Sequence, residues 1–132
     1  MQENILPSPE DLSRLLDRFG PLSPGVLQEI MAPSQIVQAK RKELVILQGD
    51  FDDHVYLLLE GAVRAFHVVE GKEYTDWFAI PGQFFCAISS FFQDRPSTHF
   101  YESIRKSVSL RIPRHVLLAL ADTHHEVERL MR

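Results

Sequence analysis

Hydrophobic residues near the start of the chain recur with the period of an α-helix. One stripe follows the spacing i, i+3, i+4, i+7: Leu12, Leu15, Leu16 and Phe19. Ser8 can cap this helix, Pro9 suits its first position, and Gly20 ends it. A second stripe begins after Ser23 and ends before Pro33: Val26, Leu27, Ile30 and Met31. The pattern therefore predicts two short amphipathic helices within residues 8–32.

From residue 35 the period shortens, and segments rich in β-branched and aromatic residues follow one another. They read IVQA, ELVILQ, HVYLLLEG, AVRAFHVV, EYTDWFAI and SVSLRI. Gly49, Gly61 and Gly71 predict turns between strands, at the spacing of roughly 8–12 residues that is typical of a sandwich or barrel. VYLLL is apolar throughout, so both faces of that strand should be covered, whereas SVSLRI alternates and turns one apolar side inward. The pattern predicts a β-roll over residues 35–112.

Helical signals return at Pro113 and continue to the end of the sequence. A first stripe follows that proline: Val116, Leu117 and Leu120. Thr123 and Glu126 have the spacing of a capping box, which predicts a new helix start. That helix presents a last apolar edge, which we expect to serve in dimerisation: Val127, Leu130 and Met131. The fold class is therefore one mainly-β domain over residues 1–132, with C-terminal helices in 113–132.

Composition places the chain among ordinary globular proteins. It has 132 residues, of which 45% are hydrophobic and 24% charged, and a formal net charge of −4. No apolar run approaches the roughly 20 residues of a membrane span, and no leader pattern opens the sequence, so we expect a cytoplasmic protein with no membrane partner. The acidic balance does not favour nucleic acid, and the three-residue basic run at 40–42 is best explained as a solvated turn.

The order of elements, two helices, a β-roll with a short internal helix, then helices, resembles the sensor domain of Crp/Fnr transcription regulators. Three segments carry the resemblance: LQGDFDDHVYLLLEGAVRAF, YTDWFAIPGQFFCAISSFFQDRPSTHF and SVSLRIPRHVLLAL. The resemblance implies a double-stranded β-helix (jelly roll) of the cyclic-nucleotide-binding-like type. It also implies a homodimer that senses an unidentified small-molecule effector.

Members of that family continue into a long dimer helix and a helix-turn-helix DNA-binding domain. This sequence stops at Arg132, so we expect a fragment of a longer regulator that contacts DNA only through the absent domain. The alternative is a stand-alone module that acts on a partner protein.

The segment PGQFFCAISSFFQDRPST, residues 81–98, occupies the place of the family's phosphate-binding cassette. In the members that bind cyclic AMP, a Gly-Glu pair contacts the ribose and an Arg-Ser or Arg-Thr pair contacts the phosphate. Here Gly82 matches the glycine, Gln83 replaces the glutamate, and Pro96 or Ser97 stands where the arginine is expected. Losing two charge-assisted hydrogen bonds of roughly 1.5–3 kcal/mol each would weaken binding by a factor on the order of 100 to 10,000. Arg95, one position earlier, remains an alternative phosphate ligand.

The predicted ligand-binding set is thus a degenerate cassette: Gly82, Gln83, Phe84, Phe85, Cys86, Arg95, Ser97 and Thr98. The four phenylalanines at 84, 85, 91 and 92 are most simply explained as core, with a pocket wall as the alternative. Cys86, the single cysteine, excludes an internal disulfide and is expected to be a small buried hydrophobe, with a redox sensor as the alternative.

No metal site, cofactor or catalytic group is predicted. The histidines are scattered: His54, His67, His99 and His115 lie far apart, and His124 and His125 are adjacent. None of these pairs can chelate a metal from one element. The run Tyr74, Thr75, Asp76 offers hydrogen-bonding groups without a triad or an acid pair. A cupin-type metalloenzyme, the remaining alternative, lacks its motif, so we expect a protein that is not an enzyme.

Overall fold

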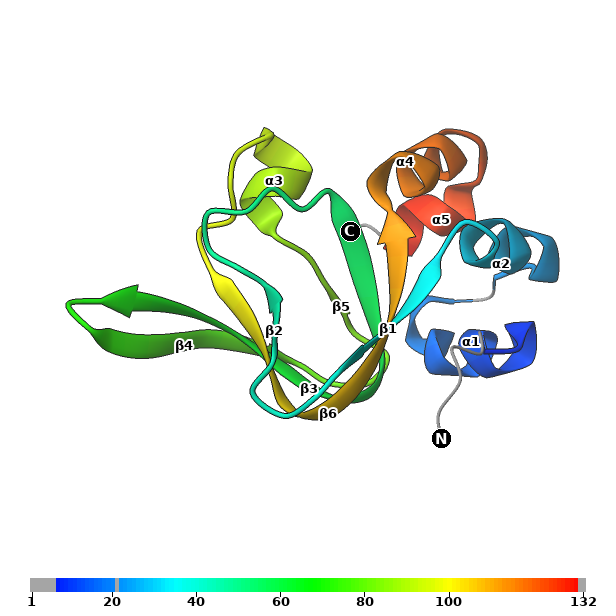
Figure 1. Cartoon of the computed structure of the whole chain (residues 1–132). Coiled ribbons are helices and arrows are strands. Elements are labelled where there is room, and N and C mark those ends of the chain that lie inside the picture. The colour runs from blue at the N-terminus through cyan, green and yellow to red at the C-terminus, as the bar shows by residue number, and fades with distance from the viewer. Residues whose placement is uncertain (1–6, 21, 131–132) are drawn as a thin grey trace.

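The computed structural model of the chain describes residues 7–20 and 22–130 (Figure 1). Helices flank the fold: α1 (Pro9–Leu15), the 3-10 turn η1 (Asp17–Phe19), α2 (Pro24–Met31), α4 (Arg114–Thr123) and α5 (His125–Leu130). Strands fill the middle, with α3 (Ile88–Gln93) after the fifth of them: β1 (Gln35–Ala39), β2 (Leu44–Ile46), β3 (His54–Val69), β4 (Lys72–Ala79), β5 (Phe84–Phe85) and β6 (Phe100–Pro113). None of the described helices is long and apolar enough to cross a membrane.

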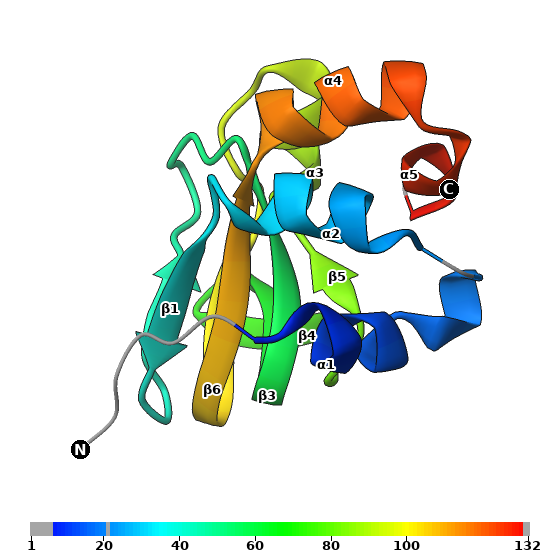
Figure 2. The same cartoon turned by 90° about the vertical axis from the view of Figure 1, so that its right-hand side faces the viewer.

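All strand pairs are antiparallel, and the main path of the sheet runs β1-β6-β3-β4, with β2 added to β6 and β5 added to β3. The long strands β3 and β6 pair from His54 opposite Pro113 to Phe66 opposite Phe100. Figures 1 and 2 show the sheet curled into a roll, with α1, α2, α4 and α5 gathered on one side and the β3–β4 hairpin projecting away from them. The predicted mainly-β jelly-roll class is confirmed.

The apolar segment VYLLL separates two cores, as its unbroken hydrophobicity predicts. Val55 and Leu57 face the cluster that the flanking helices close, whereas Tyr56 and Leu58 face the interior of the roll. Successive side chains of a strand point to opposite faces, so a strand between two cores must be apolar at every position. This strand holds β5 and therefore supports the start of the cassette.

The turn predicted at Gly61 is wrong, because β3 is one continuous strand of 16 residues. Gly61 has φ 97°, and the register with β6 shifts on both sides of it. A Cβ atom at this position would lie 2.4 Å from the Lys106 carbonyl oxygen. The glycine therefore marks a bulge where two backbones come close, a second common use of glycine within a strand.

The two N-terminal helices begin where the sequence predicts. The Ser8 hydroxyl accepts the Asp11 N–H at 3.1 Å, and the Ser23 hydroxyl accepts the Val26 N–H at 3.3 Å. Each cap joins residues three positions apart and thus depends only on local sequence.

The capping box predicted at the C-terminal end is wrong. Helix α4 runs through Thr123, whose hydroxyl donates to the Leu120 carbonyl at 3.4 Å. The Glu126 carboxylate instead accepts the Ser23 backbone N–H at 2.6 Å. Tertiary packing places the start of α2 beside α5, so the carboxylate serves a distant helix N-terminus rather than its own.

The apolar edge expected to serve in dimerisation is only partly described. Val127 is fully buried in the helix-side core of this chain, so it contributes no exposed apolar surface. The side chain of Leu130 and the whole of Met131 lie outside the described residues. Dimerisation through this helix therefore stays a prediction.

Candidate functional site

The predicted cassette starts with a turn that is bound to β3. Gly82, with φ 91°, donates its N–H to the Leu58 carbonyl at 2.8 Å, and the Gln83 carbonyl accepts the Leu58 N–H at 3.0 Å. Strand β5 and helix α3 follow, and α3 stands above the roll in Figure 1. The structure thus brings the predicted residues into one continuous loop, strand and short helix.

Gln83 closes its own turn. Its side-chain Oε1 accepts the Ile80 N–H at 3.0 Å, and its backbone N–H donates to the Ile80 carbonyl at 3.0 Å. The N-cap of α3 is Ala87, four residues further on, and it offers no side-chain cap. In this arrangement the glutamine amide stabilises a turn and is not at the helix N-terminus.

The hydroxyl groups at the end of the cassette bond within the chain. Ser97 is 3% exposed, and its hydroxyl donates to the His99 carbonyl at 2.7 Å. The Ser97 backbone donates to Asp50 and accepts from Gly49, each at 2.8 Å. The Thr98 hydroxyl lies 2.8 Å from His99 Nδ1. These contacts anchor the end of the cassette to the loop after β2.

The loop after α3 folds back on that helix. The Ser90 hydroxyl donates to the Arg95 carbonyl and the Ser89 hydroxyl donates to the Pro96 carbonyl, each at 2.7 Å. The Arg95 N–H donates to the Ser89 carbonyl at 3.0 Å. The Arg95 side chain itself is exposed to solvent. The serines of the cassette therefore hold its backbone in place.

Tyr101, on β6, occupies the N-terminus of α3, and no sequence signal identified this role. Its hydroxyl donates to the Cys86 carbonyl at 2.6 Å and lies near the backbone N–H of Ile88. Burial, followed by the nearby thiol, raises the pKa of the Tyr101 hydroxyl above its ordinary value. An anion binding at this helix end would have to displace a buried hydroxyl group first.

Aromatic rings fill the roll beneath the cassette. Phe85 stacks on Tyr56 with ring centroids 4.9 Å apart and on Tyr101 at 5.9 Å, and Trp77 meets Tyr101 edge-on at 5.4 Å. The core expectation holds for Phe85 and for Phe91, which is also buried.

The core expectation is wrong for Phe92, which is 63% exposed, and Phe84 is only half-buried. Phe92 follows Phe91 directly on a six-residue helix, so the two side chains diverge by about 100° and both cannot face the roll.

Cys86 behaves as a small hydrophobic side chain. It is half-buried against the helix-side core, and burial raises the pKa of its thiol to about 11. A thiol that stays protonated at neutral pH is a poor nucleophile and a poor metal ligand, which disfavours the redox-sensor alternative.

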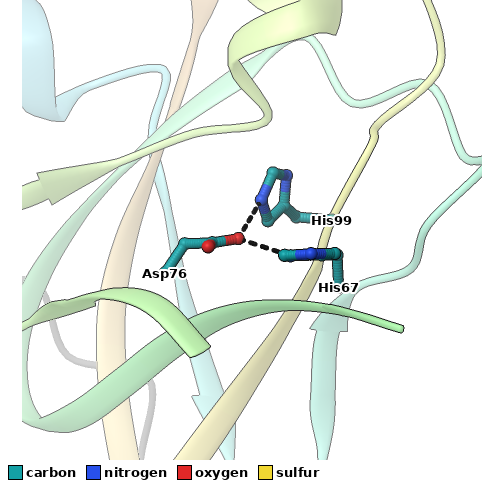
Figure 3. A group of neighbouring side chains, drawn as sticks. All are labelled: His67, Asp76 and His99. Atoms are coloured by element: carbon teal, nitrogen blue, oxygen red, sulfur yellow. Dashed lines mark hydrogen bonds and ion pairs between the residues drawn. The ribbon is translucent and has the colours of Figure 1, made fainter. Parts of the chain in front are cut away.

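The structure also brings together three residues that sequence reasoning treated separately (Figure 3). His67 Nδ1 and His99 Nε2 lie 2.7 Å and 2.6 Å from the same carboxylate oxygen, Asp76 Oδ2. Hydrogen bonds from His67 and then from His99 lower the pKa of the Asp76 carboxyl group. The predicted hairpin turn at Gly71 could have suggested that His67 and Asp76 face each other, but no sequence signal points to His99.

Solved structures of similar shape include sensor and cyclic-nucleotide-binding domains. The sensor domain of the transcriptional regulator DNR from Pseudomonas aeruginosa superposes with a TM-score of 0.80 at 22% identity, covering 93% of this chain and 85% of that one. Catabolite activator protein from Thermus thermophilus gives 0.72 at 23% identity, covering 86% and 53%. The regulatory domain of Toxoplasma gondii PKA, solved with cAMP, gives 0.74 at 19% identity, covering 89% and 46%. At these identities the likeness establishes the fold.

A search of curated proteins finds no significant match to the sequence. A scan of protein families, by contrast, matches residues 36–124 to the cyclic nucleotide-binding domain, a family made up mostly of regulatory binding domains. The match spans the β-roll, the cassette and α4, and so covers more than half of the chain. The protein therefore belongs to the cyclic nucleotide-binding domain family.

Proposed function

We propose that the chain is the effector-sensing regulatory domain of a cytoplasmic Crp/Fnr-type transcription regulator, and that its effector is not cyclic AMP. The family match and the likeness to the DNR sensor domain and to catabolite activator protein support the sensor role. The same family, which is mostly regulatory, supports a protein that is not an enzyme.

One observation carries the exclusion of cyclic AMP: the Gln83 and Ser97 side chains of the cassette, and the Tyr101 hydroxyl beside it, are already bonded within the chain. The Ser97 hydroxyl donates to the His99 carbonyl, the Gln83 amide oxygen accepts the Ile80 N–H, and the Tyr101 hydroxyl donates to the Cys86 carbonyl. A phosphate would have to replace these contacts without the bidentate guanidinium that makes phosphate binding strong. Breaking a buried hydrogen bond without full replacement costs about 1–3 kcal/mol, so the exchange is unfavourable.

The regulator would act as a homodimer, and it would contact DNA through a helix-turn-helix domain that follows this domain in the longer protein. The last apolar edge, Leu130 with Met131, remains the proposed start of the dimer contact. The reading frame beyond Arg132 tests this part of the proposal: a helix-turn-helix domain there is expected. A frame without one would favour a stand-alone module that acts on a partner protein.

Titration calorimetry with cyclic AMP and cyclic GMP tests the exclusion. We expect no saturable heat in the micromolar range from the folded protein, with a cyclic-AMP-binding relative as the positive control in the same buffer. Arg95→Ala and Ser97→Ala complete the design. Micromolar binding that either variant abolishes would show that the cassette is a working phosphate site, and the proposal would fail.

A further inference from the structure

Two histidines and one aspartate converge on a single point outside the aromatic interior. His67 belongs to β3, Asp76 to β4, and His99 to the loop before β6 (Figure 3). One ligand atom from each of them lies within 4.8 Å of the others. Among the residues that the structure describes, the Asp76 carboxylate pairs with these two imidazoles and with no lysine or arginine.

Asp76 lies at a β-bulge of the β3–β4 hairpin. In the β3–β4 ladder Ala65 opposes Trp77 but Phe66 opposes Thr75, so Asp76 is an extra residue that opposes no single partner. The pairs between this bulge and the hairpin turn, His67 with Tyr74 and Phe66 with Thr75, set Asp76 on the same face of the hairpin as His67. Bulges of this kind re-aim a side chain and are over-represented next to functional sites.

The opposite face of the hairpin holds the nearby positive charge. Arg64 donates to Glu73 and Glu102 at 2.6 Å and 2.7 Å, and its guanidinium also reaches the Thr75 hydroxyl at 2.8 Å. Those carboxylates neutralise the guanidinium on that face. The Asp76 carboxylate has the two imidazoles as its partners instead. Its negative charge can therefore attract a cation that these side chains bind.

The two ring nitrogens of His99 have different partners, and the Nε2 nitrogen is the one directed toward the cluster. Its Nδ1 lies 2.8 Å from the Thr98 hydroxyl, and its Nε2 faces Asp76. A metal-bound histidine commonly donates its other ring N–H to an oxygen, which holds the ring and sets its tautomer. The His67 ring packs against Tyr74 with centroids 5.6 Å apart, which restrains the second imidazole.

The geometry points to a three-ligand site for a divalent transition-metal cation, zinc in particular, formed by His67 Nδ1, Asp76 Oδ2 and His99 Nε2. Imidazole with carboxylate suits zinc, whereas magnesium and calcium take oxygen ligands. In a tetrahedral zinc site with bonds of about 2.0–2.1 Å, neighbouring ligand atoms lie about 3.3 Å apart. The Asp76 carboxylate would therefore move away from the two imidazoles by roughly half an ångström when zinc binds. The three side chains are 36%, 38% and 27% exposed, which leaves them room to rotate and leaves a coordination position open.

A cation in this site would connect two parts of the sensor that are distant in sequence. His99 follows the last cassette residue, Thr98, directly, while His67 and Asp76 lie on the projecting hairpin. Binding would therefore tie the C-terminal end of the cassette to the β3–β4 hairpin. A bound cation could in this way act as an effector that changes how these two parts of the fold are held together.

Zinc titration calorimetry on the whole chain in chelator-free buffer at neutral pH tests the site. We expect one saturable site in the wild-type protein, and losses of affinity of about tenfold or more in His67→Ala, His99→Ala and Asp76→Asn. Asp76→Asn keeps an acceptor for the imidazole N–H groups but removes the charge, so it separates metal binding from a simple hydrogen-bonded cluster. Thr98→Val should produce a smaller loss.

His115→Ala is the matched control, because His115 is exposed on α4 and belongs to no part of the cluster. Circular dichroism and urea unfolding without metal confirm that each variant folds. Visible absorption of a Co²⁺ complex, lost in the same three variants, gives an independent readout of imidazole ligation. The proposal is overturned if wild-type binding is not saturable, if His115→Ala weakens it equally, or if Asp76→Asn leaves it unchanged.

Discussion

The cassette and the histidine–aspartate cluster contain similar side chains in opposite situations. In and beside the cassette, the Ser97 and Tyr101 hydroxyls are buried and bonded to the backbone of this chain. In the cluster, ligand atoms are partly exposed and meet at one point without a backbone partner among them. The cassette has the sequence position of a binding site, whereas the cluster has the geometry of one.

The difference teaches that a motif's position does not decide its chemistry. A buried donor that is already satisfied stabilises the fold, and a ligand must displace its partner before binding. Exposed groups that converge can accept a ligand at little structural cost. Substitutions of buried residues in and beside the cassette should therefore change stability without changing binding, and cluster substitutions should do the reverse.

Phe85→Ala should produce the largest loss of stability. The ring is 2% exposed and stacks on Tyr56 and Tyr101, so its removal leaves a cavity and should lower the free energy of unfolding by about 3–5 kcal/mol. Urea unfolding measures the loss. Phe92→Ala is the control, because that ring is 63% exposed and should cost far less. Equal losses from the two variants would contradict the assignment of Phe85 to the core.

Tyr101→Phe should cost about 1–3 kcal/mol, because it leaves the Cys86 carbonyl without its partner while the ring stack survives. Tyr74→Phe, at a tyrosine 47% exposed, is the matched control in the same urea measurement. A gain of cyclic AMP binding in Tyr101→Phe would show that the hydroxyl alone blocks the site, and would weaken the contrast between the two regions.

Zinc should raise the unfolding midpoint of the wild-type protein, since a ligand that binds only the folded state stabilises it by RT ln(1 + [L]/Kd). Asp76→Asn should lose this rise while its midpoint without metal stays close to the wild-type value. Gln83→Ala, a cassette variant, should keep the rise in full. Thermal unfolding with and without zinc compares the three proteins, and a rise retained in Asp76→Asn would argue against the cluster as the binding point.

Arg95→Ala should have the smallest effect. The side chain is exposed, and exposed substitutions change the free energy of unfolding by about 0.5 kcal/mol or less. Calorimetry with cyclic nucleotides should give the same result as the wild-type protein. Any change in nucleotide binding would revive Arg95 as a displaced phosphate ligand.

Much of the fold was predictable because its signals are local. The caps at Ser8 and Ser23, the proline that follows each of them, and the turn at Gly71 act over a few residues. The unbroken apolar run of β3 predicted a strand with both faces covered, and Tyr56 and Leu57 do face separate cores. Of the candidate site, the location of the cassette was predictable, but the partners of its polar groups were not.

The sequence by itself determined where the two N-terminal helices begin, which side chains are apolar, and that one β-roll lies between helices. Only the tertiary structure decided that Gly61 is a bulge, that Glu126 serves Ser23, and that His99 meets Asp76 from 23 positions away. The reason is physical. A cap or a turn depends on neighbours along the chain, whereas a contact across strands depends on register, and one extra residue in a ladder redirects a side chain to the other face.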